Sequence, residues 1–300
     1  MTDYDRLSAA RNGPRRRWAA LAARVGRLLL GQPERTADLV ARSYDAAAGG
    51  YDVAWTDHMR DLSLAMLDRL DPPRGAVCVD VACGTGFLTA ELTRRTGRRA
   101  TGLDASAGML AAARAARGQA GRFVWADAVD YLAALPARSV DVVTCGWALG
   151  YTRPVAVVRQ IARVLRPGGR VGIIDNTLFS LREVLWAAAR AFAERPGALR
   201  HVMRVRFLPR SSVLAALMRA CGLSVRWTAD GAETTWCRGG RAAIDRMRAT
   251  GAAAGFEFAA DAEHTDAIFA RFAEVMEELH GTPDGVPVTH RWLAAVGVRP

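Results

Sequence analysis

Short apolar runs alternate with segments of helical periodicity between residues 76 and 176. The apolar runs lie at 76–81, 99–103, 123–126, 140–145 and 170–175, and the helical segments lie at 87–95, 106–117 and 155–165. A short apolar run favours a buried strand, whereas an apolar stripe at three- and four-residue spacing favours a helix. Strands and helices that alternate in this way predict a parallel sheet with helices on both faces.

The pattern becomes mainly helical after residue 177. Helices are expected at 178–207 (interrupted by Pro196 and Gly197), 211–220, 241–247 and 265–280, with strands at 225–235 and 286–298. The pattern therefore indicates the α/β class, with a doubly wound, mostly parallel seven-stranded sheet. We expect an N-terminal helical extension at 1–43, a core at 44–177, and a part at 178–300 that completes the sheet and carries helical insertions as a lid.

The segment at 15–30 has the pattern of a basic amphipathic helix. One face is apolar and arginines lie opposite, at positions Trp18, Leu21, Val25, Leu28 and Leu29 and at Arg16, Arg17, Arg24 and Arg27. Such a helix can lie on an anionic membrane surface. We favour the alternative that it packs on its own protein, and a weak membrane-surface contact stays open.

The charge and the composition of the chain narrow the classes of protein to which it can belong. Half of the 300 residues are apolar, and no apolar run approaches the ~20 residues that span a bilayer. All 41 basic residues are arginine, and segments 1–42 and 94–122 together hold the whole net charge of +11. The missing lysines point to a compositional bias of the genome instead of selection for phosphate binding. We therefore expect no nucleic-acid partner, and we expect no signal peptide.

The five cysteines have no spacing typical of a metal site or of a disulfide framework. They lie at Cys78, Cys83, Cys145, Cys221 and Cys237, with no CxxC pair. We expect no metal and a cytoplasmic location. The sequence leaves the oligomeric state open between a monomer and a homodimer.

The stretch VCVDVACGTGFLT at 77–89 carries the strongest chemical signal. Glycines after a buried strand let the backbone approach a ligand, and the following helix presents its first N–H groups to it. A dinucleotide-binding loop needs GxGxxG, but here Gly84 and Gly86 are followed by Thr89. Asp80 ends the strand, and a carboxylate suits a ligand with an ammonium and a sulfonium better than a pyrophosphate.

Five segments in register resemble the Rossmann-like S-adenosylmethionine (SAM) methyltransferases. VDVACGTG resembles the first motif of that family, GLDAS at 102–106 the second and ADA at 126–128 the third. SVDVVTCGWAL at 139–149 and LRPGGRVGIID at 165–175 resemble the fourth and fifth strands. The resemblance covers about 76–176, and it implies that the core at 44–177 binds SAM and releases S-adenosylhomocysteine.

The resemblance also implies roles for three acids. Asp104 would accept hydrogen bonds from the ribose hydroxyls, Asp127 from the adenine amino group, and Asp80 would help to hold the methionine ammonium. Each acid has the alternative of capping a helix or a turn. The other expected cofactor-binding residues are Tyr51, Ala82, Cys83, Gly84, Gly86, Ala105, Met109, Ala128 and Cys145.

The sequence names no catalytic residue, because it contains no recognisable triad or dyad. Methyl transfer from a sulfonium depends mainly on alignment in a dry pocket, and it needs a base only if the nucleophile arrives protonated. SYDAAAGGYDVAWTDHM at 43–59 resembles a helix that covers the cofactor, which favours Tyr51 over Tyr44 or Trp55. Trp147 is a candidate wall of the methyl site or a plain core residue, and Asp175 and Asn176 are candidate substrate contacts.

We therefore expect a SAM-dependent methyltransferase that acts on a small, apolar or aromatic molecule through an O, N or C atom. One alternative is a SAM-binding protein of this fold that catalyses a non-methylating reaction. Another is a membrane-associated lipid or quinone methyltransferase. An RNA methyltransferase and an arsenic methyltransferase fit less well, because RNA-binding signatures and a cysteine cluster are not apparent.

Overall fold

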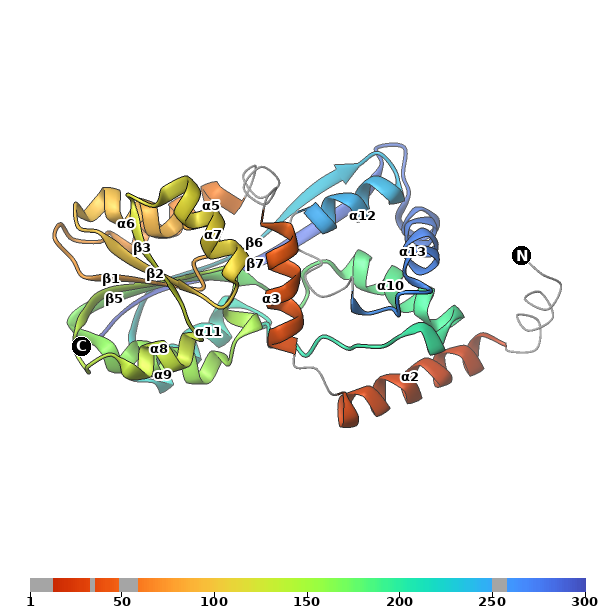
Figure 1. The fold of residues 1–300 in the computed structure, drawn as a ribbon, viewed down its shortest axis with the longest axis horizontal. Helices are drawn as coiled ribbons and strands as arrows, with labels where there is room; N and C mark the ends of the chain where they lie inside the picture. Colours follow the sequence, from red (N-terminus) through yellow and green to blue (C-terminus); the bar gives the residue numbers. More distant parts are fainter. Residues whose placement is uncertain (1–12, 33–35, 49–58, 250–257) are drawn as a thin grey trace.

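A computed structural model describes residues 13–32, 36–48, 59–249 and 258–300. Its described residues form one seven-stranded sheet in the order β3-β2-β1-β4-β5-β7-β6 (Figure 1). Strands β1 to β5 are parallel, and β7 runs antiparallel to both of its neighbours. The strands are β1 (Cys78–Val81), β2 (Ala100–Asp104), β3 (Gly121–Trp125), β4 (Val140–Gly146), β5 (Leu165–Asn176), β6 (Ser224–Cys237) and β7 (Val286–Val298). The predicted sheet and fold class are confirmed.

Helices cover both faces of this sheet (Figure 1). Helices α5, α6 and α7 lie on one face, and α8, α9 and α11 lie on the other. The core helices are α5 (Met59–Leu70), α6 (Phe87–Thr96), α7 (Ala107–Arg117), α8 (Ala128–Ala134), α9 (Pro154–Val164) and α11 (Ser211–Ala220). The remaining helices are α2 (Pro14–Gly31), α3 (Thr36–Ala47), α10 (Arg182–Glu194), α12 (Gly240–Ala249) and α13 (Thr265–His280), with short 3₁₀ turns η1 (Leu149–Tyr151) and η2 (Pro196–Ala198).

Two apolar cores explain this layered arrangement. On one face Met66 and Leu70 of α5 and Leu92 of α6 pack on the sheet, and all three are fully buried. On the other face Ile161 of α9 and Leu214 of α11 are equally buried. A sheet that is covered on both faces has apolar strands without alternation, which is why these strands appeared as continuous apolar runs.

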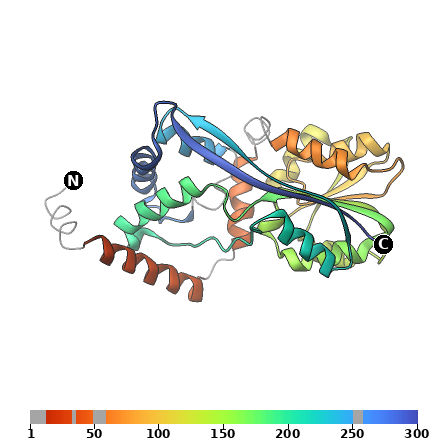
Figure 2. The ribbon, with the colours of Figure 1, turned by 180° about the vertical axis from the view of Figure 1, so that it is seen from behind.

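The long antiparallel pair of strands β6 and β7 connects the sheet to a second lobe. Residues 292–298 of β7 pair with β5, whereas residues 286–291 pair only with β6. The strand pair therefore continues beyond the sheet (Figure 2), and its far end packs against α10, α12 and α13. The predicted division into 1–43, 44–177 and 178–300 stays a prediction, since the shared strand pair does not show how independent these parts are.

Helix α2 packs on the second lobe. Leu21 and Leu28 are buried beside Phe192 of α10, and Arg24 donates a 2.8 Å hydrogen bond to the Leu199 carbonyl. The favoured alternative for this segment, packing on its own protein, agrees with these contacts. Trp18 stays 40% exposed, although its ring meets that of Trp186 edge to face at 6.4 Å.

Two of the predicted elements are wrong in extent. The helix expected over 178–207 ends at Glu194, and residues 199–207 contain no helix. Their backbone N–H groups bond instead to distant acceptors, such as Arg200 to the Ala259 carbonyl and Arg206 to the Gly150 carbonyl. Strand β5 already begins at Leu165, whereas we expected the preceding helix to include residue 165 and the strand to begin at residue 170. Helices α5 and α8 were not predicted.

Within the four described ranges, no helix combines the length and the apolar character that a bilayer span requires.

We expect Gly240→Ala to lower the free energy of unfolding by about 1–3 kcal/mol, because its new methyl group would overlap the backbone carbonyl of Ala273 in α13. Urea unfolding measures the change. The matched control is Gly197→Ala, where the added methyl group meets no atom within 4 Å. Equal stability of the two variants would contradict the tight α12–α13 contact.

Candidate cofactor site

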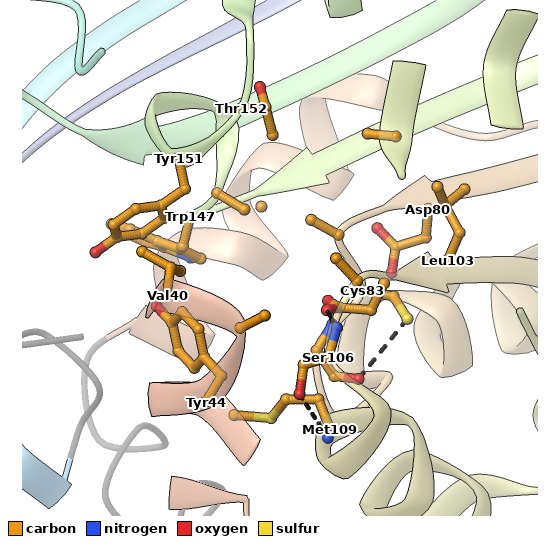
Figure 3. Close-up of a pocket in the computed structure, with 18 of the residues that line it drawn as sticks. Val40, Tyr44, Asp80, Cys83, Leu103, Ser106, Met109, Trp147, Tyr151 and Thr152 are labelled. Carbon is orange, nitrogen blue, oxygen red and sulfur yellow. Dashed lines mark hydrogen bonds between the residues drawn. The ribbon is translucent and has the colours of Figure 1, made fainter. Parts of the chain in front are cut away.

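A cavity of about 160 Å³ lies at the carboxyl ends of β1, β2 and β4 (Figure 3). Tyr44 and Tyr151 stand on one side of it, and Asp80 and Cys83 on the other. The wall comes from eight elements, α3, β1, α6, β2, α7, α8, β4 and η1, and from the loops between them. The lining residues include Val40, Tyr44, Asp80, Ala82, Cys83, Gly84, Phe87, Leu88, Asp104, Ala105, Ser106, Met109, Asp127, Ala128, Gly146, Trp147 and Tyr151.

The glycine-rich loop after β1 has the left-handed backbone that its sequence predicts. Ala82, Gly84 and Gly86 have φ values of 53°, 54° and 87°, a region that glycine enters without strain. A Cβ on Gly86 would stand 2.6 Å from the Phe123 ring, so the loop can pass β3 only with glycine there. The first turn of α6 then faces the cavity through Phe87 and Leu88.

Asp80 is a buried carboxylate at the end of β1. Its two oxygens accept hydrogen bonds from the hydroxyls of Thr89 and Thr144, both at 2.7 Å. Burial raises the pKa of Asp80 to about 6, partly offset by these hydrogen bonds, and the nearby Asp104 raises it further. A cation in the cavity would favour the ionised form of this carboxylate.

Asp104 joins two neighbouring segments at the end of β2. One carboxylate oxygen accepts from the Gly84 N–H and the other from the Ser106 N–H, both at 2.8 Å. Burial raises the pKa of this carboxyl as well. Since each oxygen has two lone pairs, both can still accept from a ligand hydroxyl in the cavity.

Helix α3 forms one wall of the cavity, and Asp45 holds the helix in this place. Its carboxylate accepts from the Ser106 hydroxyl at 2.5 Å and from the Gly108 N–H at 2.8 Å, so α3 is tied to the start of α7. Ser106 is the predicted N-cap and accepts from the Met109 N–H at 3.0 Å. The sequence analysis did not single out Asp45, although it stands in the motif SYD next to Tyr44.

Asp127 caps the start of α8, which is the role we gave as the alternative to binding the adenine amino group. Its carboxylate accepts from the N–H groups of Val129 and Asp130 at 2.8 and 3.1 Å. Arg153 lies 3.8 Å away, and the carboxylate is more than half exposed. Asp127 also lines the cavity, so it can cap α8 and contact a ligand at the same time.

Nine of the twelve expected cofactor-binding residues line this cavity, two do not, and one lies outside the described residues. The nine are Asp80, Ala82, Cys83, Gly84, Asp104, Ala105, Met109, Asp127 and Ala128. Gly86 lies behind the wall, and the Cys145 side chain is fully buried in the core under the sheet, because successive strand residues point to opposite faces. Gly146 takes the position in the wall that we expected for Cys145. Tyr51 lies outside the described residues, and Tyr44 stands in the wall.

Trp147 has a strained backbone beside the cavity. Its φ is 61°, uncommon for a bulky residue, and its N–H donates to the Ile174 carbonyl at 2.6 Å. The indole N–H donates to the Ser63 hydroxyl at 2.9 Å. Trp147 is therefore both a core residue and part of the cavity wall, which joins the two alternatives of the sequence analysis.

A second cavity, of about 330 Å³, adjoins the first at Tyr151, which lines both. Tyr151 meets Tyr44 and Phe207 edge to face, with centroids 6.1 and 5.1 Å away. Of the candidate substrate contacts, Asn176 lines the second cavity. Asp175 does not; burial raises its pKa to about 7, and it anchors the turn η1 by accepting from the Gly150 N–H at 2.7 Å.

The polar groups that line the first cavity fit SAM. Carboxylates at adjacent strand ends can accept from a ribose diol, an amino group and an ammonium, whereas a pyrophosphate would meet the negative charges of the buried Asp80 and the half-buried Asp104. Within the described residues, no group of three or more His, Cys, Asp and Glu side chains could hold a metal ion.

Comparisons with known proteins agree with this chemistry. Residues 79–173 match the family model described as "Methyltransferase domain". The chain is 30% identical over 63% of its length to a demethylmenaquinone methyltransferase of Corynebacterium kroppenstedtii, of which it covers 84%. It is 32% identical over 47% of its length to a 2-phytyl-1,4-naphtoquinone methyltransferase of Thermosynechococcus vestitus, of which it covers 61%.

A solved structure shows the same fold. The YcgJ protein of Bacillus subtilis superposes with a TM-score of 0.55 at 18% identity, over 80% of this chain and 98% of that protein. The chain belongs to the class I SAM-dependent methyltransferases. It is a methyltransferase for small molecules, and SAM is its cofactor.

We expect the affinity for SAM to rise as the pH rises from about 5 to 7. Asp80 ionises in the free protein with a pKa of about 6, and a cationic ligand binds better to the ionised carboxylate. Titration calorimetry across this range measures the profile, which Asp80→Asn should flatten. The exposed Asp245→Asn is the matched control, and an equally steep profile in Asp80→Asn would remove this carboxylate from the interaction.

Proposed function

We propose that this methyltransferase acts on an apolar aromatic small molecule with a quinone-like ring. The single observation that carries this proposal is the contact of the two cavities at Tyr151, because an acid-lined cofactor cleft there adjoins a space with apolar walls. The names of the two curated relatives, which both refer to quinones, support the same substrate class.

We propose that SAM lies along the carboxyl ends of β1, β2 and β3. Asp104 would accept from the ribose hydroxyls and Asp127 from the adenine amino group, while Ala105 and Met109 flank the ring. The methionine ammonium would lie near Asp80 and the loop residues Ala82, Cys83 and Gly84, with Ala128 beside the adenine. Gly86 and Cys145 would act only through packing. Tyr44 would cover the cofactor, and the covering role expected for Tyr51 stays a prediction.

When bound, SAM supplies a methyl group on a sulfonium, which leaves as a neutral thioether. The protein's contribution is alignment and exclusion of water. Tyr44 on α3 and Tyr151 on η1 close the cavity opposite the acids, and Asp45 and Asp175 hold these two elements in place. Asn176 is placed to hydrogen-bond a ring oxygen of an acceptor in the second cavity.

Finer statements on location and partners are also proposals. The described structure has all five cysteines as free thiols, which supports a reducing compartment such as the cytoplasm. A membrane-surface contact through 15–30 is supported by five arginines and no acid in α2, and by the exposed Leu29 and Leu30 at its end. The choice between monomer and homodimer stays a prediction.

The proposed function is tested with SAM and a reduced naphthoquinone, by mass spectrometry of S-adenosylhomocysteine and of the methylated product. We expect both to form at equal rates. Asp104→Ala should weaken SAM binding by roughly 10- to 150-fold, the range for loss of hydrogen bonds to a charged group. Thermal unfolding checks that the variant is folded. Tight SAM binding without any product from a panel of aromatic acceptors would contradict the substrate class.

The membrane contact is tested by cosedimentation with vesicles that contain phosphatidylglycerol. Reversing the exposed Arg16 and Arg27 to glutamate should weaken binding at least about tenfold, since each arginine near an anionic surface contributes about 1 kcal/mol. The control reverses Arg219 and Arg226, which are exposed on α11 and β6. Charge reversal is preferable to deletion, because α2 also contributes to the wall of the second cavity. Equal effects of both pairs would point to net charge alone.

A further inference from the structure

The second cavity lies between α2, α10, the end of β5 and the segment 199–207. Tyr151 lines both this cavity and the first one. Elsewhere in the wall, Leu21, Phe192 and Ala259 belong to the apolar cluster that packs α2 against the second lobe. The lining of the second cavity therefore extends from Tyr151, beside the first cavity, to apolar residues under the N-terminal helix.

The walls of the second cavity are almost wholly apolar. Among the described residues that line it, none is an acid or an arginine; apart from Tyr151 the polar ones are Asn176, Thr177, Ser180 and His201. The remainder are Leu21, Val25, Leu178, Leu181, Val184, Leu185, Ala188, Ala189, Phe192, Leu199, Val202, Met203, Val205, Phe207 and Ala259. A space of this kind holds water poorly and favours a hydrocarbon ligand.

The polar side chains in this wall are largely used by the protein itself. Ser180 donates to the Asn176 side-chain oxygen at 3.1 Å and accepts from the Arg291 N–H at 3.0 Å. The Thr177 hydroxyl accepts from the Phe179 N–H at 3.2 Å, and the His201 ring bonds to the Phe258 carbonyl at 2.6 Å. A polar ligand would therefore find few partners in the body of the cavity.

Two leucines of the wall are partly exposed. Leu178 and Leu185 are 50% and 44% exposed, although both line the cavity. We therefore expect a ligand to enter beside these two leucines, between α10 and the segment that precedes it.

We propose that the second cavity binds a hydrocarbon chain, alkyl or isoprenoid, that is attached to the methyl acceptor. This inference rests on the proposed function only for the acceptor ring, which would stand at Tyr151 while its chain extends toward α2. Leu21 and Val25 of α2 then set the longest chain that fits. The N-terminal helix is, in this proposal, a specificity-determining part of the substrate site.

Binding of hydroquinones with n-alkyl chains of increasing length, measured by calorimetry without SAM, tests the chain site directly. For the unsubstituted protein, the affinity should rise about fourfold for each added methylene and level off once the cavity is full. Affinity that is independent of chain length would overturn the proposal. Binding that follows chain length without any methyl transfer would support the chain site and contradict the proposed function instead.

Two substitutions shorten the cavity from different walls. Val25→Trp on α2 and Ala188→Phe on α10 should each weaken binding of the longest chain by at least tenfold and leave the shortest chain unaffected. The matched control is Ala22→Trp, which lies on the exposed face of α2. Unchanged SAM affinity shows that the variants are folded. If both bind the long chain as the unsubstituted protein does, the chain does not occupy this cavity.

A further experiment distinguishes a hydrocarbon chain that belongs to the methyl acceptor from a lipid that binds separately. A free n-alkanol of matched length should compete with the alkyl hydroquinone for binding and inhibit its methylation. An alkanol that binds without such competition would show a lipid site separate from the acceptor, and would overturn the proposal.

Discussion

The arrangement of the cofactor cleft depends on two carboxylates that bind backbone N–H groups. Asp104 holds the glycine-rich loop at Gly84 and the start of α7 at Ser106, and Asp45 ties α3 to the same turn. Three segments that are distant in the sequence thus meet at one strand end. These hydrogen bonds place α3 over the cleft, and α3 in turn brings Tyr44 into edge-to-face contact with Tyr151.

The second constraint is the long antiparallel strand pair β6–β7, which belongs to both lobes. Its sheet end pairs with β5, and its far end packs on α12 and α13. Since β5 also ends at Asp175 and Asn176, the same part of the sheet positions the turn η1 and part of the wall of the second cavity. The second cavity therefore forms where the sheet, the lobe and α2 meet, and no single element contains it.

The core of the fold and the acidic side of the cleft could be predicted from local patterns. Ser106 was predicted as an N-cap and caps α7, and the helix over 265–280 has the bounds that its apolar stripe indicates. The segment 199–207 could not be predicted, because its backbone bonds go to residues far along the chain. Cys145 and Gly146 show the same limit, since a shift of one residue along a strand changes the face of the sheet.

The sequence by itself determined the class of protein and its cofactor chemistry, because strand-end acids and a glycine-rich loop are local features with a known spacing. Only the tertiary structure decided what α2 packs against, that Tyr44 and Tyr151 line the cleft, and that a second, apolar cavity exists. Those outcomes depend on contacts between elements up to about 180 residues apart, such as Arg24 with Leu199 and Arg204 with the end of α2. Local apolar periodicity shows which face of a helix is buried, but it does not show which other element packs against that face.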